Sequence, residues 1–305
     1  MIKRFDAEAT ENLLSFDLLV KELDRTVAEY AAGKIASPER LVIPLADGGV
    51  MLSMPASAED MASHKLVNVC PGNVSKGLPT INGEVVAYDA VTGVSLFALD
   101  GPTVTGRRTA AITLLAISRL RATPPKRIAI IGTGKQASTH AQAFSAYFPD
   151  AELVVAGISR EEETRFCARH TSSGVRPFTD RTWSGVDVVV TLTTSKSPVY
   201  TEAATKDRLV VGVGAFTPDA AEVDRDTVRA STPIVDDPAG ARHEAGDLIQ
   251  AGVDWAKVIS LGDVLEGRAS INGPVFFKSV GCAAWDLAAC RVARTAIAAG
   301  ASEQH

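Results

Sequence analysis

The chain has 305 residues, with 31 Lys and Arg against 36 Asp and Glu, and a formal net charge of −5. This length predicts about two domains with a sizeable core. A content of 46% hydrophobic and 22% charged residues is that of a globular protein and not of a disordered one. A mildly acidic chain without a Lys/Arg cluster is not expected to bind nucleic acid. The sequence contains no run of about 18 apolar residues, so it predicts no membrane-spanning helix.

The cysteines are spread along the chain without Cys-x-x-Cys spacing, at Cys70, Cys167, Cys282 and Cys290. Residues 1–16 are acidic and polar and contain no apolar segment, unlike a secretory signal peptide. Free thiols in a reducing cytoplasm are therefore expected. Because the His, Cys and carboxylate residues show no metal-ligand spacing, the sequence predicts no metal site.

Residues 10–33 carry apolar side chains at helical spacing and predict one helix that ends at Gly33. Short β-rich runs follow at Leu41–Pro44, Val50–Met54, Lys65–Cys70, Glu84–Asp89 and Val94–Leu99. Asp47-Gly48-Gly49 and Thr92-Gly93 are hairpin sequences between such runs. This part of the chain is expected to form a smaller α+β domain with an antiparallel, barrel-like or sandwich-like sheet.

The pattern changes after residue 105. Ala110–Leu120 is apolar all round and predicts a buried helix, and Pro124-Pro125 ends it and marks a domain boundary. Strands, most of them separated by helical segments, are predicted at Arg127–Ile131, Leu153–Ala156, Val186–Thr191, Leu209–Val213, Ile234–Val235 and Val258–Ser260. The alternation indicates an α/β fold with a doubly wound, Rossmann-type parallel sheet. An Ala-rich helix at Gly281–Ala299 is expected to return to the first domain. The predicted domains are therefore 1–122 with 280–305, and 123–279.

A glycine-rich turn follows the first of these strands, with the sequence Gly132-Thr133-Gly134-Lys135-Gln136-Ala137. A G-x-G-x-x-A pattern between an apolar strand and a helix is typical of a dinucleotide-binding loop. Gly132 makes the tight turn, Gly134 lets backbone N–H groups approach a pyrophosphate, and Ala137 lets helix and strand pack closely. The phosphates would lie at the helix N-terminus, which favours anions.

The end of the next strand bears on the choice of cofactor. NAD sites usually place an Asp or Glu about 20 residues after the loop, whereas Gly157-Ile158-Ser159-Arg160 follows the strand here. Ser159 and Arg160 are suited to a 2′-phosphate, because a guanidinium matches phosphate geometry, although Glu161–Glu163 would partly oppose it. The sequence favours NADPH and leaves NADH possible. Further loops at strand ends are expected to line the cofactor crevice, at Thr193-Thr194-Ser195 and Gly214-Ala215-Phe216.

Cationic and hydroxyl residues in the first domain are candidates for binding an anionic substrate. Arg40 and Lys65 stand at the starts of strands, and Thr80 ends a turn before another strand. Arg108 is less ordinary, because it precedes an apolar helix, and a buried cation needs an anionic partner. Bidentate recognition of a carboxylate is the usual role of such an Arg.

Motifs in both domains occur in one order along the chain: Gly77-Leu78-Pro79-Thr80, Thr105-Gly106-Arg107-Arg108-Thr109-Ala110-Ala111, Gly132–Ala137 and Phe277-Lys278-Ser279-Val280-Gly281. The set resembles the ornithine cyclodeaminase/mu-crystallin family, and the resemblance covers nearly the whole chain. It implies a homodimer of two-domain subunits, in which a Rossmann domain accompanies an antiparallel sheet domain that also forms the dimer interface.

The resemblance also implies roles for single residues. It suggests that Arg40, Lys65 and Arg108 hold the α-carboxylate of the substrate, with Thr80 close by. Cofactor contacts are further suggested at Thr105, Lys278 and Gly281. Met54 and Phe216 are candidate contacts of the substrate ring, although either could be core. The proton donor stays open between Lys65, Thr80 through water, and solvent. His64 is a poor candidate, because neighbours in a strand face opposite sides.

Phe216 departs from ornithine cyclodeaminase, which has an acidic residue in the matching segment. Because a phenyl ring cannot accept a proton, deamination of ornithine is not expected. The segment instead resembles that of family members that reduce Δ1-pyrroline-2-carboxylate or Δ1-piperideine-2-carboxylate to L-proline or L-pipecolate with NAD(P)H, a step of proline metabolism. The alternatives are ornithine cyclodeaminase, an alanine-dehydrogenase-like activity, or a low-turnover NADPH-dependent binding protein of the mu-crystallin kind.

Overall fold

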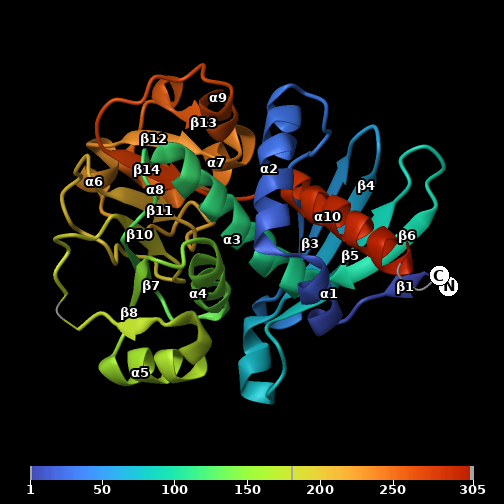
Figure 1. Cartoon of the computed structure of the whole chain (residues 1–305), viewed down its shortest axis with the longest axis horizontal. Helices are drawn as coiled ribbons and strands as arrows, with labels where there is room; N and C mark the ends of the chain where they lie inside the picture. Colours follow the sequence, from blue (N-terminus) through green and yellow to red (C-terminus); the bar gives the residue numbers. More distant parts are fainter. Residues whose placement is uncertain (1, 180, 303–305) are drawn as a thin grey trace. The chain divides into compact units, whose positions relative to one another are not determined.

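The computed structural model describes residues 2–179 and 181–302. The chain divides into two compact units, drawn in Figure 1. Unit 1 is Met1–Arg108 with Cys282–His305, and unit 2 is Thr109–Gly281. Met1 and residues 303–305, which the predicted first domain includes, lie outside the described residues.

Helix α3 (Gly101–Leu120) contains the first division between the units, so the boundary does not lie at Pro124-Pro125. The apolar run predicts a helix from Ala110, whereas the helix begins at Gly101, directly after a strand. The carboxylate of Asp100 accepts a hydrogen bond of 2.8 Å from the backbone N–H of Thr103 and so stabilises the first turn. Arg108 therefore lies within the helix and not ahead of it.

Unit 1 contains a six-stranded sheet in the order β1-β6-β5-β4-β3-β2. Its strands are β1 (Lys3–Arg4), β2 (Leu41–Pro44), β3 (Val50–Ser57), β4 (Ala62–Val69), β5 (Ile81–Tyr88) and β6 (Ser95–Asp100). The ladders from β2 to β6 are antiparallel, as predicted, while β1 pairs with β6 in parallel. The sheet is open and not closed into a barrel. Its edge strands are too short to pair with each other, and Pro44 in β2 lacks a backbone donor.

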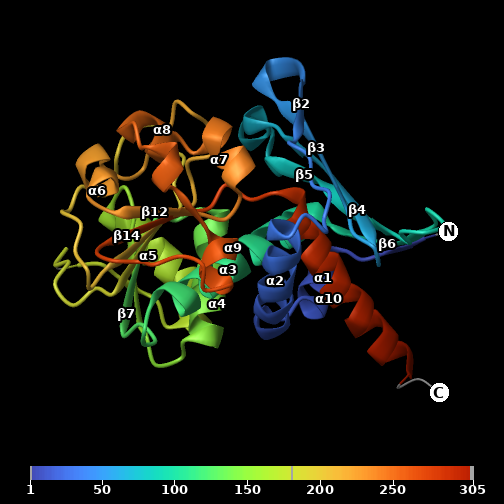
Figure 2. The same cartoon turned by 90° about the horizontal axis from the view of Figure 1, so that it is seen from above.

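Three helices lie together on one face of this sheet, as Figure 2 shows: α1 (Ala7–Leu13), α2 (Phe16–Ala31) and α10 (Ala283–Ser302). The prediction of one helix over residues 10–33 is wrong, because the chain breaks at Leu14. The Ser15 side chain accepts from the backbone N–H of Leu18 and begins a second helix there. The return of the C-terminal helix is confirmed, since α10 packs on α2 and on β3, β4 and β5.

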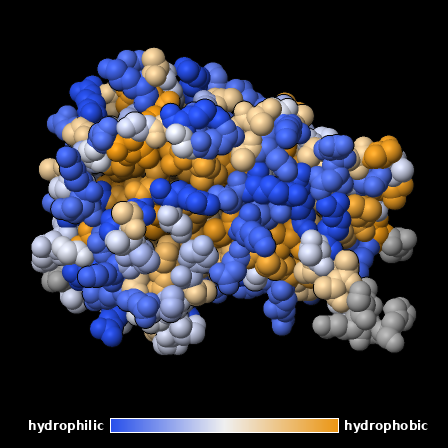
Figure 3. Space-filling model, turned by 45° about the horizontal axis from the view of Figure 1, so that its top comes forward, coloured by the Kyte–Doolittle hydropathy of each residue, from blue (hydrophilic) through white to orange (hydrophobic). Residues whose placement is uncertain are grey.

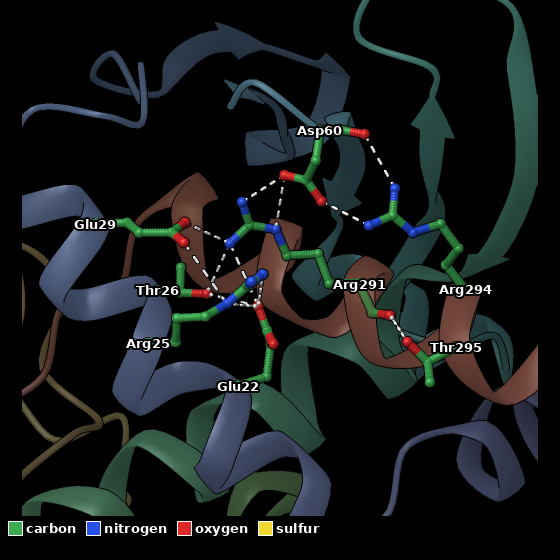
Figure 4. Close-up of polar contacts among 8 residues, drawn as sticks. All are labelled: Glu22, Arg25, Thr26, Glu29, Asp60, Arg291, Arg294 and Thr295. Carbon is green, nitrogen blue, oxygen red and sulfur yellow. Dashed lines mark hydrogen bonds and ion pairs between the residues drawn. The ribbon is translucent and has the colours of Figure 1, made fainter.

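A cluster of ion pairs fastens α10 to its neighbours within unit 1 (Figure 4). Arg291 is buried and contacts Glu29 on α2 at 2.7 Å and Asp60 in the β3–β4 turn at 2.5 Å. Arg294, one turn further along α10, reaches the other oxygen of Asp60 at 2.6 Å. Burial opposes the charge on Asp60, but the two guanidinium groups hold its pKa below the ordinary value.

Unit 2 contains an eight-stranded sheet in the order β13-β12-β14-β11-β10-β7-β8-β9, and its ladders are parallel. The strands are β7 (Arg127–Ile131), β8 (Glu152–Ala156), β9 (Arg176–Pro177), β10 (Val188–Thr191), β11 (Leu209–Gly212), β12 (Thr232–Val235), β13 (Ile259–Ser260) and β14 (Val275–Lys278). The doubly wound parallel sheet is confirmed, although the sequence patterns miss β9 and β14. The strand order reverses between β7 and β10, and ligands bind at such a switch point.

The remaining α-helices are α4 (Lys135–Tyr147), α5 (Arg160–Arg169), α6 (Arg225–Arg229), α7 (Pro238–Glu244), α8 (Gly246–Ala251) and α9 (Leu261–Leu265). Short 3₁₀ turns lie at Ala46–Gly48, Pro71–Lys76, Thr171–Ser173 and Trp255–Lys257. The face in Figure 3 is largely hydrophilic, with apolar residues visible between the polar ones. Among the described residues, none of the helices combines the length and apolar character that crossing a membrane would take.

Candidate active site

The predicted dinucleotide loop joins β7 to α4 in unit 2. Gly132 has a φ of +124°, and a Cβ there would lie 2.6 Å from the carbonyl oxygen of Leu192, so only glycine fits. Gly134 is the N-cap of α4 and supplies no side-chain hydrogen bond, which leaves the first N–H groups of the helix available for an anion. The Oε1 atom of Gln136 is buried without a partner among the described residues. This loop fits the pyrophosphate of a dinucleotide.

His140 lies one turn further along α4 and supports the loop. Its Nδ1 lies 2.8 Å from the carbonyl oxygen of Gln136, and its Nε2 lies 3.1 Å from Oγ1 of Thr113 on α3. Burial lowers the pKa of His140 to about 4. The side chain is therefore neutral and structural, as its helical position suggests.

The buried carboxylate of Glu222 holds the loops after β10 and β11 together. It accepts hydrogen bonds from N–H and Oγ1 of Thr193 at 2.6 and 2.8 Å and from N–H of Ala215 at 2.9 Å. The loops approach so closely that a Cβ on Gly214 would lie 2.1 Å from the Thr193 carbonyl oxygen. Both predicted loops are thus fixed at the carboxyl edge of the sheet by an acid that the motif analysis does not include.

A second buried acid, Asp236, fixes the segment that follows β14. It accepts from Oγ of Ser279 at 2.8 Å and from the backbone N–H of Gly281 at 3.0 Å. The Lys278 ammonium is fully buried and forms an ion pair of 2.8 Å with Asp247. Because that charge is engaged inside unit 2, only the backbone of Lys278 is left to contact a cofactor in the predicted way.

The residues predicted to select the cofactor lie at the end of β8. Ser159 caps α5 by accepting from the backbone N–H of Glu162. Arg160 is exposed and contacts the buried carboxylate of Glu163 at 3.2 Å. Arg181 also donates to Glu163, so two guanidinium groups share one carboxylate. Two cations therefore contact one carboxylate here, which suits a phosphate group, while Glu162 beside Thr133 partly opposes it.

The cationic candidates of unit 1 meet around an acid. Lys65 on β4 and Arg108 on α3 are buried, with relative exposures of 2% and 5%. Nζ of Lys65 lies 2.8 Å from Oδ2 of Asp286 on α10, and Nε of Arg108 lies 3.2 Å from Oδ1 of the same carboxylate. Arg40, half-buried just before β2, is close enough for its charge to act on Lys65. Burial, opposed by Asp286, lowers the pKa of Lys65 to about 8.

The other predicted residues of unit 1 differ in their distance from this cluster. Met54 is buried directly opposite Lys65 in the β3–β4 ladder. Thr80 stands just before β5, while Lys65 pairs with Val85 further along that strand, so Thr80 is about 16 Å from this pairing position. Thr105 on α3 has a buried Oγ1 without a partner among the described residues, which leaves the hydroxyl free for a ligand.

Two further candidates have separate surroundings. Phe216 in unit 2 is half exposed after the β11 loop. His64 faces the side of the sheet opposite to Lys65, and its Nε2 lies 2.8 Å from Oγ of Ser53.

Asp286 is the residue of this cluster that the sequence analysis does not identify. A lone carboxylate in the apolar stretch from Trp285 to Cys290 is the signal by which it could be found, since a buried acid needs a cation.

A doubly wound parallel sheet with a G-x-G-x-x-A loop at its switch point defines a Rossmann-type dinucleotide-binding protein. Unit 1 adds a mixed sheet that buries two cations against one carboxylate. The chain belongs to the ornithine cyclodeaminase/mu-crystallin family, whose model matches residues 3–301.

Individual relatives are similar over nearly their whole length. A Δ1-pyrroline-2-carboxylate/Δ1-piperideine-2-carboxylate reductase of Azospirillum brasilense is 63% identical over 298 residues, which cover 97% of this chain and 96% of the relative. Δ1-Pyrroline-2-carboxylate reductase 2 of Burkholderia ambifaria is 62% identical over 299 residues, with the same coverage. The structure of Thermococcus litoralis Δ1-pyrroline-2-carboxylate reductase in complex with NADH and L-proline has a TM-score of 0.87 at 25% identity and covers 98% of both chains.

Proposed function

We propose that this chain is an NAD(P)H-dependent oxidoreductase that reduces a cyclic 2-imino acid, Δ1-pyrroline-2-carboxylate or Δ1-piperideine-2-carboxylate, at its C=N bond. The observation that carries the proposal is the buried pair of cations, Lys65 and Arg108, on a single carboxylate. A surplus of buried positive charge is a receptor for an anion. The reductases named among the relatives above act on cyclic imines with such a carboxylate.

The two units divide the work of the reaction. Lys65, Arg108 and Arg40 hold the carboxylate of the imino acid, and so fix the position of the neighbouring imine carbon. The dinucleotide, when bound to unit 2, would supply the hydride that this carbon accepts, and the imine nitrogen takes up a proton, so that C=N becomes CH–NH. Gly132, Gly134 and the N-terminus of α4 hold its pyrophosphate. Fixing the reacting carbon relative to the donor can contribute several kcal/mol, about 7 or more in favourable cases. The products are L-proline or L-pipecolate, with the L configuration taken from the family resemblance.

Phe216 favours reduction of an imine over deamination of ornithine. Ornithine cyclodeaminase needs an acid at the matching position, and the phenyl ring of Phe216 offers none. Incubation of the protein with ornithine and dinucleotide should therefore release no ammonia. Substantial ammonia release would favour the cyclodeaminase alternative, and turnover of pyruvate with ammonia would favour an alanine-dehydrogenase-like activity.

We further infer that NADPH is preferred over NADH. The residues around Arg160 support a site for the 2′-phosphate. The stretch 157–160 directly after β8 contains no acid, and Glu163, which accepts from the Gly157 N–H, is engaged by Arg160 and Arg181. The Thermococcus litoralis relative has NADH bound. Michaelis constants for the two dinucleotides, measured with one imine substrate, test this inference.

A homodimer is proposed through the outer face of the unit 1 sheet. Strand β2 is an edge of the sheet among the described residues, and two of its apolar side chains share a face with Leu66 on β4 and are 59% and 42% exposed: Leu41 and Ile43. Leu66 on β4 is also exposed there. Exposed apolar groups of this kind mark a protein interface. Light scattering should give about twice the mass of one chain, and Ile43→Lys should shift the protein towards a monomer.

The four cysteines are free thiols, and a reducing cytoplasm is the compartment that maintains them.

The deciding experiment for the reaction follows the oxidation of NADPH with the pyrroline and the piperideine carboxylate side by side. Rapid oxidation with either supports the reductase. Binding of dinucleotide with negligible oxidation for both would favour a low-turnover binding protein.

A further inference from the structure

Asp286 brings together two residues that lie far from it in the sequence. It stands in the first turn of α10 and is fully buried, while its two oxygens contact different cations from β4 and α3. Oδ2 lies 2.8 Å from Nζ of Lys65, and Oδ1 lies 3.2 Å from Nε of Arg108. One carboxylate thus fixes the separation of two cations that the proposed reaction needs.

The positive charges around Asp286 outnumber the negative ones. Lys65 and Arg108 with Asp286 leave one positive charge for a second carboxylate, and the nearby Arg40 adds to it. Without any acid, the cations would repel each other inside the unit, where burial already disfavours charge. With a second acid, the surplus of the buried group would vanish and the attraction for the substrate carboxylate would be weaker. A single acid between the two cations satisfies both requirements.

Asp286 also supports the protonation of Lys65. Burial and the charges of Arg108 and Arg40 favour the neutral amine, and Asp286 is the acid that opposes them. A further titratable group near Asp286 is Cys290, one turn along α10, whose pKa is raised by burial and by the Asp286 charge. Its thiol is neutral and adds no charge. The ammonium state of Lys65 therefore depends on Asp286.

We propose that Asp286 is a positioning residue of the carboxylate site, which orients Lys65 and Arg108 as the two arms that receive the substrate carboxylate and keeps Lys65 charged. The proposal rests on the proposed function, because it takes that carboxylate to belong to the imino acid. Each oxygen of Asp286 contacts one of the two cations, so the acid acts on the substrate carboxylate through them.

The test compares Asp286→Asn with the wild type by the pH profile of kcat/KM for the imine substrate. The wild type should lose activity above a pH of about 8, as Lys65 loses its proton. Asp286→Asn should move this loss to lower pH by at least about one pH unit, and should raise KM more than it lowers kcat. An unchanged pH profile with an unchanged KM would overturn the proposal.

Asp60→Asn is the matched control, because it removes another carboxylate that α10 uses, at Arg291 and Arg294. This variant should lower the melting temperature and leave the pH profile as it is. Asp286→Glu keeps the charge but displaces the oxygens. Its kcat/KM should be lower than that of the wild type at every pH, but the loss of activity at alkaline pH, the alkaline limb of the pH profile, should occur at the same pH as in the wild type. A shift of the limb in Asp286→Glu as large as that in Asp286→Asn would contradict the charge argument.

A binding measurement needs no turnover. Pyrrole-2-carboxylate, a planar carboxylate, is titrated into the wild type and into Asp286→Asn at pH 7.5 in buffers of different ionisation enthalpy. Binding to Asp286→Asn should take up more protons than binding to the wild type, because Lys65 is then largely neutral before the bound carboxylate restores its charge. Equal proton uptake by the two proteins would overturn the proposal. If the imines are not reduced but the uptake differs in this way, the proposed function fails while the role of Asp286 stands.

Discussion

Met54 on β3 and Lys65 on β4 are direct partners in the antiparallel ladder, and both side chains are buried. Partners opposite each other in a ladder point to the same face of the sheet. The thioether side chain of Met54 therefore helps to exclude water from the ammonium that contacts Asp286. The lowered pKa of Lys65 depends on this exclusion as well as on the neighbouring charges.

Met54→Ala should raise the pKa of Lys65 above about 8, because water then reaches the ammonium. The alkaline limb of kcat/KM should move to higher pH, and stability should fall by about 2–4 kcal/mol. Met61→Ala is the control, since Met61 is also fully buried in unit 1 but lies four positions before Lys65. It should cost similar stability and leave the limb in place; equal shifts in both variants would contradict the argument.

Arg108 and Arg107 are neighbours on α3 with different tasks. The Arg107 guanidinium donates to the carbonyl oxygen of Leu14 at 2.6 Å and to Glu11 at 3.0 Å. Arg108→Met should lower kcat/KM for the imine about 10- to 100-fold, the loss expected for a hydrogen bond to a charged group. Arg107→Met should lower the melting temperature with little change in kcat/KM. Steady-state kinetics and thermal unfolding of both variants check this, and equal kinetic losses would refute the distinction.

Substitutions at Gly134 and Gly214 are expected to affect different properties, cofactor binding at Gly134 and folding at Gly214. A Cβ on Gly134 would meet no protein atom within 4 Å, whereas one on Gly214 would lie 2.1 Å from the Thr193 carbonyl oxygen. Gly134→Ala should fold normally and bind NADPH about tenfold or more weakly, because the methyl group occupies the approach of the pyrophosphate. Gly214→Ala should unfold at a markedly lower temperature. Fluorescence titration with NADPH and thermal melts decide, and undiminished binding by Gly134→Ala would count against the loop assignment.

Arg160→Gln tests the preference for NADPH. The variant should raise KM for NADPH about tenfold, through loss of a charged contact, and leave KM for NADH within about twofold. Arg165→Gln on the same helix is the control, because Arg165 is exposed and pairs with Glu161 alone among the described ion pairs. Equal losses for both dinucleotides in Arg160→Gln would assign Arg160 a structural role.

Asp60→Asn should lower stability in a pH-dependent way. The pKa of Asp60 is lowered in the folded protein, so its contribution is complete above the unfolded-state value of 3.8 and is lost as pH falls through the folded-state value. At pH 7 the variant should lose about 1–2 kcal/mol, a figure reduced by partial exposure to solvent. Near pH 2 the melting temperatures of variant and wild type should converge. A constant difference across this range would show that shape, and not charge, accounts for the loss.

Local spacing predicts the parts of the fold that depend on neighbouring residues. The loop at Gly132 and the hairpin at Asp47 follow from turn chemistry, and β7 has the predicted bounds. The break at Leu14 has a local signal as well, in the capping Ser15, but seven apolar positions at helical spacing on both sides obscure it.

Ion pairs between residues far apart in the sequence are the part of the structure that residue spacing cannot predict. The sequence predicts an anionic partner for Arg108 on physical grounds and takes it to be the substrate carboxylate, whereas Arg108 also pairs with Asp286, which stands 178 residues further along the chain. Glu222 lies 31 residues from Thr191 and is equally hidden. Such acids become visible only when the strands and helices that carry their partners are packed together.

Because α10 is the last helix of the chain, the ribosome makes it after the strands and helices that it packs against. Lys65 and Arg108 leave the ribosome well before Asp286, so the nascent unit 1 carries two unbalanced cations until α10 docks beside β4. With the proposed role of Asp286, the carboxylate site is complete only once the chain has been made through Asp286. A chain that ends before Asp286 contains the whole sequence of the dinucleotide loop but lacks the acid of the carboxylate site.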